Sequence, residues 1–271
     1  MRLDGKVAIV TGSTKGIGRV IAATLAAQGA TVVAAGRSTK RGEAVVAATT
    51  DAGGEALFVP TDISDEASVA NLIETTVATY GSLTTLVNNA ASTDLLAASD
   101  DEVAKVELDS WERVLRTTLT GTMLAAKHAI PEMITAGGGS IINISSDSSL
   151  RAPKGFAAYG AAKAGVNSLT RSIAVEYGMD NVRANAIIVG LILPPQAVPI
   201  FEADPILDAK LRAGRSLPRL GRREDVANAV AFFASDESAY LNGTMLPVDG
   251  GASIMSNILG KAEIFEGKPE A

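Results

Sequence analysis

The sequence predicts an α/β fold built on one doubly wound, parallel sheet of about seven strands. Short apolar runs alternate with longer segments of helical character, and no obvious linker interrupts them. A glycine-rich turn follows the first apolar run, as expected where a strand leads into a helix. The 271 residues are 47% hydrophobic, which is enough to fill a large core. Repeated strand–helix units favour a parallel sheet with right-handed crossovers.

The first half of the chain contains four of the predicted strands, each a short apolar run that suits a buried strand. An Ala-rich helix over 19–28 ends at Gly29, and Asp65 is placed to cap a helix over 66–80. Residues 91–106 form a long polar connection that we expect to be partly helical near its end. The four strands are expected at residues 6–11, 31–35, 56–59 and 85–88.

The second half continues the alternation. A long helix from Ser110 to about Ala136 ends at the three glycines 137–139, which cannot easily continue it. A second long helix runs from about Ala157 to Tyr177. The remaining strands are expected at residues 140–145, 182–189 and 244–248.

This pattern is interpreted as a single domain over residues 1–256, followed by a tail without a motif over 257–271. Residues from about 190 to 215 are apolar and broken by prolines, which is typical of a lid over an apolar pocket. The alternative is that this stretch packs against the core or a neighbouring subunit. The acidic run Asp100–Glu102 is interpreted as a solvated loop.

The turn after the first strand has the features of a phosphate site. Its glycines follow the spacing Gly12-x-x-x-Gly16-x-Gly18 and lead directly into a helix. Glycines let the backbone approach a ligand, and a helix N-terminus offers free N–H groups and a positive dipole end. A second apolar run, 31–35, supplies the strand that a full βαβ unit needs.

Tyr159 and Lys163 indicate acid–base chemistry. They are four residues apart, so they share one face of a helix, and Ser146 lies thirteen residues upstream of Tyr159. An ammonium beside a phenol is expected to lower the phenol pKa from about 10, which suits proton transfer to or from a substrate oxygen. A serine hydroxyl can hydrogen-bond the same oxygen. The alternative is an ordinary surface Tyr–Lys pair.

Together these residues resemble the short-chain dehydrogenase/reductase family in its single-domain, Rossmann-like form. The resemblance covers about residues 4–252 and rests on a set of motifs in the family's order. Those motifs are Thr11-Gly12-x-x-x-Gly16-x-Gly18, Asn88-Asn89-Ala90-Ala91, Ser146 with Tyr159 and Lys163, Asn185-Ala186 with Gly190, Asp225-Val226-Ala227, and Asn242-Gly243 with Asp249-Gly250-Gly251.

The resemblance implies hydride transfer between a nicotinamide cofactor and a secondary alcohol or ketone, with Tyr159 as general acid/base. Ser146, Lys163 and Thr118 complete the expected catalytic set. The residues expected to bind the cofactor are Gly12, Thr14, Lys15, Gly16, Ile17, Gly18, Arg37, Asp62, Ile63, Asn89, Ala90, Tyr159, Lys163, Gly190 and Ile192.

Residues at the end of the second strand favour NADP(H) over NAD(H). A carboxylate there would accept from the ribose 2′-hydroxyl of NAD, whereas an arginine accommodates the 2′-phosphate of NADP. The chain has Arg37 and no carboxylate, and Lys15 adds positive charge in the glycine-rich turn. NAD remains an alternative if Arg37 is a solvated surface charge.

Four positions depart from the family pattern, one of them Val189, which precedes Gly190 where the family has a proline. Thr118 stands where the family has an asparagine in a proton relay, and a hydroxyl is shorter and offers fewer hydrogen bonds than an amide. Ala91 replaces a glycine beside the cofactor. Pro194 stands where a threonine usually binds the carboxamide. These departures leave open a cofactor-binding regulatory or structural protein with weak catalysis.

The lid composition favours a lipophilic ketone or secondary alcohol as substrate, with a 3-oxoacyl thioester as the alternative. The formal charge of −6 argues against broad binding of nucleic acid or anionic membranes. The chain has no cysteine, hence no disulfide or thiolate metal site, and no metal is expected. No signal peptide or membrane-spanning run is seen, so a cytoplasmic location is expected. The resemblance implies a homo-oligomer, either a tetramer or a dimer.

Overall fold

Seven parallel strands form the centre of the computed structural model, which describes residues 1–92, 100–194 and 196–255. Their order in the sheet is β3-β2-β1-β4-β5-β6-β7, so the chain changes direction across the sheet between β1 and β4. Ligands of such sheets bind at the carboxyl ends of the strands near this switch point. The strands are β1 (Val7–Thr11), β2 (Thr31–Gly36), β3 (Glu55–Pro60), β4 (Thr85–Asn88), β5 (Gly139–Ser146), β6 (Val182–Val189) and β7 (Met245–Val248).

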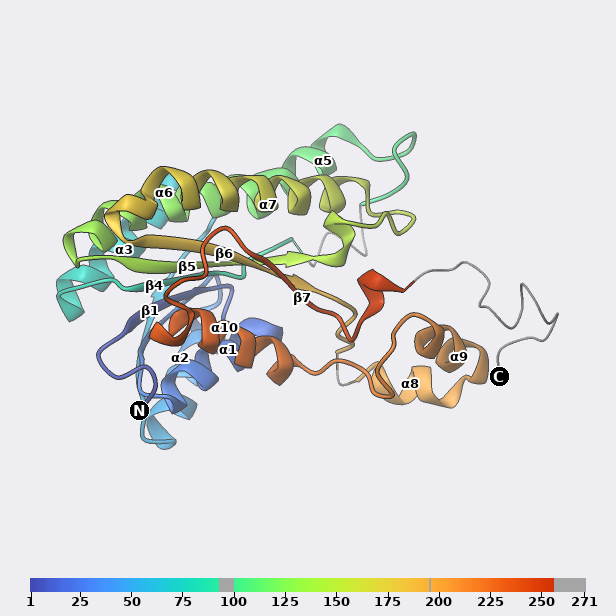
Figure 1. Ribbon diagram of the computed structural model, residues 1–271, viewed down its shortest axis with the longest axis horizontal. Helices are drawn as coiled ribbons and strands as arrows, with labels where there is room; N and C mark the ends of the chain where they lie inside the picture. The colour runs from blue at the N-terminus through green and yellow to red at the C-terminus, as the bar shows by residue number, and fades with distance from the viewer. Residues whose placement is uncertain (93–99, 195, 256–271) are drawn as a thin grey trace.

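Helices cover both faces of the sheet, which confirms the predicted doubly wound α/β class (Figure 1). On one face α1 (Gly16–Ala27), α2 (Thr39–Asp51) and α10 (Arg223–Ala234) bury their apolar sides against the strands. On the other face α3 (Glu66–Tyr80), α6 (Gly121–Thr135) and α7 (Ala157–Tyr177) do the same. The sheet is therefore buried on both sides, which explains why its strands are nearly continuous apolar runs.

The predicted strands lie within one or two residues of those observed. Asp65 accepts a hydrogen bond from the Ser68 N–H at 3.1 Å, which confirms its predicted capping of α3. The predicted end of α6 is also confirmed: Gly137 and Gly138 have φ angles of +87° and +132°, and the Gly138 N–H donates to the Met133 carbonyl. Both glycines occupy backbone conformations that other residues adopt at a cost.

The long helix expected over 110–136 is interrupted. It begins as α5 (Leu108–Leu115), widens into one π-helical turn at Arg116–Thr120, and continues as α6. A π turn holds one residue more per hydrogen-bonded ring than an α turn and is frequent at functional sites. The Thr122 hydroxyl donates to the Thr118 carbonyl at 2.8 Å, so a side chain takes part in the turn.

Among the α-helices in the described residues, four were not predicted: α2, α10, and two in the expected lid, α8 (Val198–Ala203) and α9 (Pro205–Ala213). In Figure 1, α8 and α9 (orange) stand apart from the helices that flank the sheet, to the right of β7. The predicted tail over 257–271 lies outside the described residues. None of the helices in the described parts of the chain is long and apolar enough to cross a membrane.

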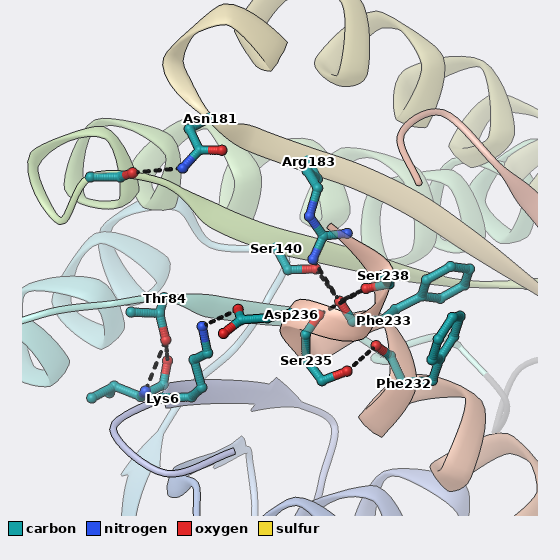
Figure 2. A network of polar contacts seen from close by, with 12 residues as sticks. Lys6, Thr84, Ser140, Asn181, Arg183, Phe232, Phe233, Ser235, Asp236 and Ser238 are labelled. Atoms are coloured by element: carbon teal, nitrogen blue, oxygen red, sulfur yellow. Dashed lines mark hydrogen bonds and ion pairs between the residues drawn. The ribbon is translucent and has the colours of Figure 1, made fainter. Parts of the chain in front are cut away.

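The end of α10 is bound to the sheet by a network of polar contacts (Figure 2). The Phe233 carbonyl accepts hydrogen bonds from Ser140 on β5 at 2.7 Å, from Arg183 on β6 at 3.0 Å and from Ser238 at 3.0 Å. Lys6, next to β1, pairs with Asp236 at 2.7 Å. These contacts join the end of α10 and the residues after it to β5, to β6 and to the residue before β1. Those three segments lie far apart in the chain.

Candidate active site

The glycine-rich turn joins β1 to α1 and leaves the start of α1 open. Helix α1 begins at Gly16, and neither a side-chain cap nor an acidic residue occupies its first turn. The first N–H groups of a helix have no partner within it, and Gly16, Ile17 and Gly18 of this helix start line a cavity. Gly12 and Gly16 have φ angles of +65° and +61°, so the turn uses the conformational freedom of both. This is the local geometry of a phosphate site.

Asn89 holds this turn against the end of β4. Its side-chain amide donates to the carbonyls of Thr11 and Gly12 at 2.9 and 3.1 Å. The Thr11 hydroxyl in turn accepts from the N–H groups of Asn89 and Ala90 at 3.0 and 3.1 Å. A Cβ at Gly18 would lie 2.4 Å from the Asn89 amide nitrogen, so only glycine fits there. The two loops are thus fixed relative to each other before any ligand binds.

A cavity of about 1020 Å³ opens at the carboxyl ends of the strands. Every residue expected to bind the cofactor lines it, and so does Ser146. Thr118 is the exception among the predicted site residues, because it is completely buried and does not reach the cavity. Of the departures from the family pattern, Ala91, Val189 and Pro194 also line it.

The wall of the cavity is strongly basic although the chain as a whole is acidic. Asp62 is the one carboxylate among the described lining residues. Two hydrogen bonds from Ser64, from its hydroxyl and its N–H, hold the pKa of Asp62 below its usual value, and Arg37 and Arg116 add to the decrease. A cavity of this charge suits an anionic ligand. The basic lining residues are Lys15, Arg37, Arg41, Arg113, Arg116, Lys163 and Arg223.

Ser146, Tyr159 and Lys163 come together at the other end of the cavity. Ser146 ends β5, while Tyr159 and Lys163 are one turn apart on α7, which packs against β5 and β6. The Lys163 ammonium lies 5.5 Å from the centroid of the Tyr159 ring. It donates a hydrogen bond to the Ile144 carbonyl at 2.5 Å. The hydroxyl, phenol and ammonium groups expected from the sequence therefore share one site.

Burial is the main cause of the pKa shifts of Tyr159 and Lys163. It raises the pKa of the Tyr159 phenol to about 12, although a hydrogen bond with Ser146 favours the phenolate; the nearby Asp147 carboxylate adds to the increase. Burial lowers the pKa of the Lys163 ammonium to about 8. The expectation that Lys163 lowers the phenol pKa is therefore wrong for this structure. The phenolate loses more by leaving water than it gains from an ammonium that is itself buried and directed at a carbonyl.

Asn167 and Ser149 link Ser146 to helix α7 by hydrogen bonds. Neither residue was predicted from the sequence. Asn167 lies one turn after Lys163 on α7, and its amide donates to the Ser149 hydroxyl at 2.8 Å. That hydroxyl donates to the Ser146 carbonyl at 2.6 Å. The chain of hydrogen bonds fixes Ser146 relative to the helix that carries Tyr159. The spacing Tyr159, Lys163, Asn167, four residues each time, was the available signal.

The further basic residues of the cavity were missed because they come from separate elements. Arg41 lies on the first turn of α2, four residues after Arg37, and only an assigned helix would have placed it beside the cavity. Arg116 lies in the π turn and donates to the Ser64 carbonyl at 3.0 Å. Arg223 begins α10. No local pattern in the sequence connects these positions.

Comparisons with known proteins agree with this geometry. A family model described as Enoyl-(Acyl carrier protein) reductase matches residues 12–253. A cis-4-hydroxycyclohexanecarboxylate dehydrogenase from Sinomonas cyclohexanicum is 41% identical over 246 residues, which cover 91% of this chain and 96% of the relative.

Two solved structures match closely. A short-chain type dehydrogenase/reductase from Mycobacterium ulcerans has a TM-score of 0.88 at 31% identity, covering 98% of this chain and 96% of its own. A 7 alpha-hydroxysteroid dehydrogenase complexed with NADH and 7-oxo glycochenodeoxycholic acid has a TM-score of 0.84 at 30% identity, covering 92% and 95%. With a family model and relatives that span nearly the whole chain, this protein belongs to the short-chain dehydrogenase/reductase family.

Proposed function

We propose that this protein is an NADP(H)-dependent oxidoreductase that interconverts a secondary alcohol and a ketone, with Tyr159 as general acid/base. The observation that carries the proposal is that Ser146, Tyr159 and Lys163 line the same cavity as the uncapped start of α1. A proton donor and a site for a phosphate-bearing cofactor thus open onto one space. The relatives named as dehydrogenases of hydroxylated compounds support the same class of reaction.

The cavity fits a dinucleotide along its length. The glycine-rich turn and the start of α1 would hold the pyrophosphate, because N–H groups and the helix dipole favour anions. Asp62, Ile63, Asn89 and Ala90 would border the adenine end. Tyr159, Lys163, Gly190 and Ile192 would hold the nicotinamide end. A bound nicotinamide cofactor supplies the hydride for carbonyl reduction and accepts it in alcohol oxidation.

Tyr159, Ser146 and Lys163 have separate roles in the transfer of the proton. With a pKa of about 12, Tyr159 keeps its proton at neutral pH and is ready to donate it to a carbonyl oxygen that is being reduced. The Ser146 hydroxyl donates a hydrogen bond to the same oxygen as negative charge develops there. Lys163, with a pKa of about 8, releases a proton near neutral pH and can replace the one that Tyr159 gives up. The pair is therefore suited to carbonyl reduction.

Arg37 and Lys15 support the choice of NADP(H). Both line the cavity together with Arg41, and no carboxylate follows β2. A 2′-phosphate bears two negative charges that an arginine pair can neutralise by charged hydrogen bonds. NAD(H) is the alternative, since the related hydroxysteroid dehydrogenase was solved with NADH.

For the substrate we favour a lipophilic cyclic ketone or secondary alcohol. Leu150, Phe156 and Leu191 are exposed apolar side chains that lie close in sequence to Ser146, Tyr159 and Gly190. Two of the related proteins carry names of cyclic hydroxy or oxo compounds. A 3-oxoacyl thioester is the alternative; the family model's description names a reductase of another acyl thioester, the enoyl form.

We further propose that the protein works as a homo-oligomer. Met123 and Ile134 on α6 and Val175 on α7 are exposed apolar side chains on the helices of one face. Burial of such side chains between copies would remove apolar surface from water. Light scattering coupled to size-exclusion chromatography distinguishes a dimer or tetramer from a monomer.

The decisive experiment compares Tyr159→Phe with the parent protein on a panel of cyclic ketones and 3-oxoacyl thioesters, using NADPH and NADH. Turnover, followed by nicotinamide absorbance, is expected to fall about 10²–10⁴-fold, while cofactor affinity is retained. Tyr177→Phe, at the far end of α7, is the matched control and is expected to behave as the parent. Near-normal turnover in Tyr159→Phe would refute the mechanism; no turnover in the parent would favour a regulatory cofactor-binding role.

A further inference from the structure

Asp100 contacts the catalytic helix directly, although it lies far from it in sequence. It belongs to the connection between β4 and α5. Its Oδ1 atom accepts from the Ala158 N–H and its Oδ2 atom from the Tyr159 N–H, each at 3.0 Å. Oδ1 also accepts from the N–H of Asp101 at 3.0 Å. The interpretation of this acidic run as a solvated loop is thus wrong for Asp100, whose carboxylate binds three backbone donors.

Helix α7 has no other side-chain cap among the residues that the structure describes. Phe156 occupies the N-cap position without a capping hydrogen bond, and the first turn of α7 contains no acidic residue. The first N–H groups of a helix have no partner within it, so they need an acceptor from elsewhere. The carboxylate of Asp100 provides it, and its negative charge also complements the positive end of the helix dipole.

Asp100 holds the backbone of the first turn of α7, whose Ala158 side chain is buried in a cluster with Val114 of α5. One turn later, Lys163 is buried and bound to the Ile144 carbonyl. One turn further, Asn167 is bound to Ser149. Before the helix, residues 150–154 are exposed, although Arg151 is bonded to the Ala252 carbonyl at 2.8 Å and to the Asp147 carboxylate at 3.2 Å. Tyr159 lies between this exposed stretch and Lys163, and Asp100 accepts a hydrogen bond from its backbone N–H.

We infer that Asp100 is a positioning residue that holds the first turn of α7 and thereby places the Tyr159 phenol beside Ser146. This role rests on the proposed function, in which Tyr159 donates the proton. A proton donor must lie within hydrogen-bond reach of the reacting oxygen, and small displacements of catalytic groups reduce rates steeply.

The first arm of the test measures the contact without relying on activity. Hydrogen–deuterium exchange is compared in the parent, Asp100→Ala and Asp100→Asn. Exchange of the amides at 158 and 159 is expected to become about tenfold faster in Asp100→Ala, because their acceptor is lost. Amides near the end of α7 are expected to keep their rates. Asp101→Asn is the control, since its carboxylate accepts only the neighbouring Glu102 N–H in the described part of the chain.

The second arm measures catalysis. In Asp100→Ala, kcat is expected to fall about 10- to 100-fold with cofactor affinity within about twofold of the parent. Asp100→Asn keeps one acceptor oxygen, so its kcat is expected to be intermediate. Proton transfer from a misplaced phenol becomes slower than hydride transfer, so the solvent deuterium isotope effect on kcat is expected to increase. A smaller folded fraction alone would lower kcat and leave the isotope effect unchanged.

Parent-like exchange at 158 and 159 in Asp100→Ala overturns the inference. So does a loss of kcat without an increase in the isotope effect, because Asp100 would then serve only helix stability. If the parent shows no turnover with either cofactor, the proposed function fails, and the exchange measurement alone decides whether Asp100 holds the first turn of α7.

Discussion

Arg37, directly after β2, and Arg41, on the first turn of α2, are expected to set the cofactor preference. Arg37→Ala and Arg41→Ala should each weaken NADPH binding by about 1.5–3 kcal/mol, because each removes a charged hydrogen bond to the 2′-phosphate. NADH lacks this phosphate and should bind nearly as before. Fluorescence titration with both cofactors measures the difference, with Arg171→Ala on the exposed side of α7 as control. Equal losses for both cofactors would show that neither arginine recognises the phosphate.

The buried Lys163 ammonium lowers the free energy of unfolding, and the size of this effect depends on pH. Because burial lowers its pKa to about 8, the folded protein loses this proton before the unfolded chain does, whose lysine titrates near 10.5. From about pH 8 upward the unfolded state binds more protons, so the lysine's unfavourable contribution decreases as pH rises. At pH 7, Lys163→Met should therefore be inactive and more stable by on the order of 2–3 kcal/mol.

Denaturant unfolding at pH 7, 8, 9 and 10 tests this. The advantage of Lys163→Met over the parent should shrink steadily between pH 8 and pH 10, whereas Lys154→Met, at an exposed position, should follow the parent throughout. A constant advantage across this range would mean that Lys163 does not change its charge there.

Local sequence was sufficient to predict much of the candidate site. Gly12, Gly16 and Gly18 are recognisable because a tight turn and close backbone contacts impose their spacing. Asp100 was not recognised, because its role depends on a helix 58 residues away. The phenol pKa was misjudged for a related reason: proximity of Lys163 follows from helical spacing, whereas burial follows only from the packed structure.

Among the elements, the π turn at Arg116–Thr120 is the main departure from expectation. The Thr118 hydroxyl is buried there without a hydrogen-bond partner among the described residues. A buried, unpaired hydroxyl is costly, and it is a natural position for an ordered water. We propose that Thr118 and such a water connect the buried side of Lys163 to solvent, in the place of the family's asparagine.

Thr118→Val keeps the shape of the side chain and removes its hydroxyl. Turnover is expected to fall and its pH profile to shift, with cofactor affinity little changed, because the water loses a partner. Steady-state kinetics over pH 6–10 measure the effect. Thr122→Val, which removes a hydroxyl bound to the Thr118 carbonyl in the same turn, serves as the control for disturbance of the turn itself. If turnover in Thr118→Val has the same pH profile as in the parent, Thr118 serves only in packing.

The elements that the sequence predicted differ physically from those it did not. The inner strands, such as β1, β5 and β6, are buried on both sides, so each is an apolar run whose ends are marked by polar or glycine residues. Helix α2 is rich in threonine and charged residues and buries few side chains, so its periodicity is weak. Directly after the π turn, Gly121 approaches Ile63 so closely that a Cβ there would lie 2.8 Å from it, and no local pattern reveals this contact.

For the whole molecule, alternating strands and helices were enough to predict a parallel, doubly wound sheet. The strand order β3-β2-β1-β4-β5-β6-β7 depends on pairings between segments far apart in the chain, for which local periodicity holds no information. The cavity at the switch point follows from this order, because it brings the ends of β1 and β4 together. The basic charge of the cavity wall also depends on the folded structure, because its residues come from elements that lie far apart in the chain.

The packing of α10 has a consequence for synthesis of the protein. Ile21 and Leu25 of α1 share an apolar core with Val230 and Phe233 of α10, and the end of α10 is bonded to β5 and β6 (Figure 2). About two hundred residues of nascent chain separate the two helices, so the part of α1 that packs against α10 stays uncovered until those residues have been synthesised. Long-range closure of this kind makes folding slow and aggregation-prone. A chain ending at Arg222 should therefore lack cooperative thermal unfolding by circular dichroism and fail to bind NADPH, although it contains the entire glycine-rich turn.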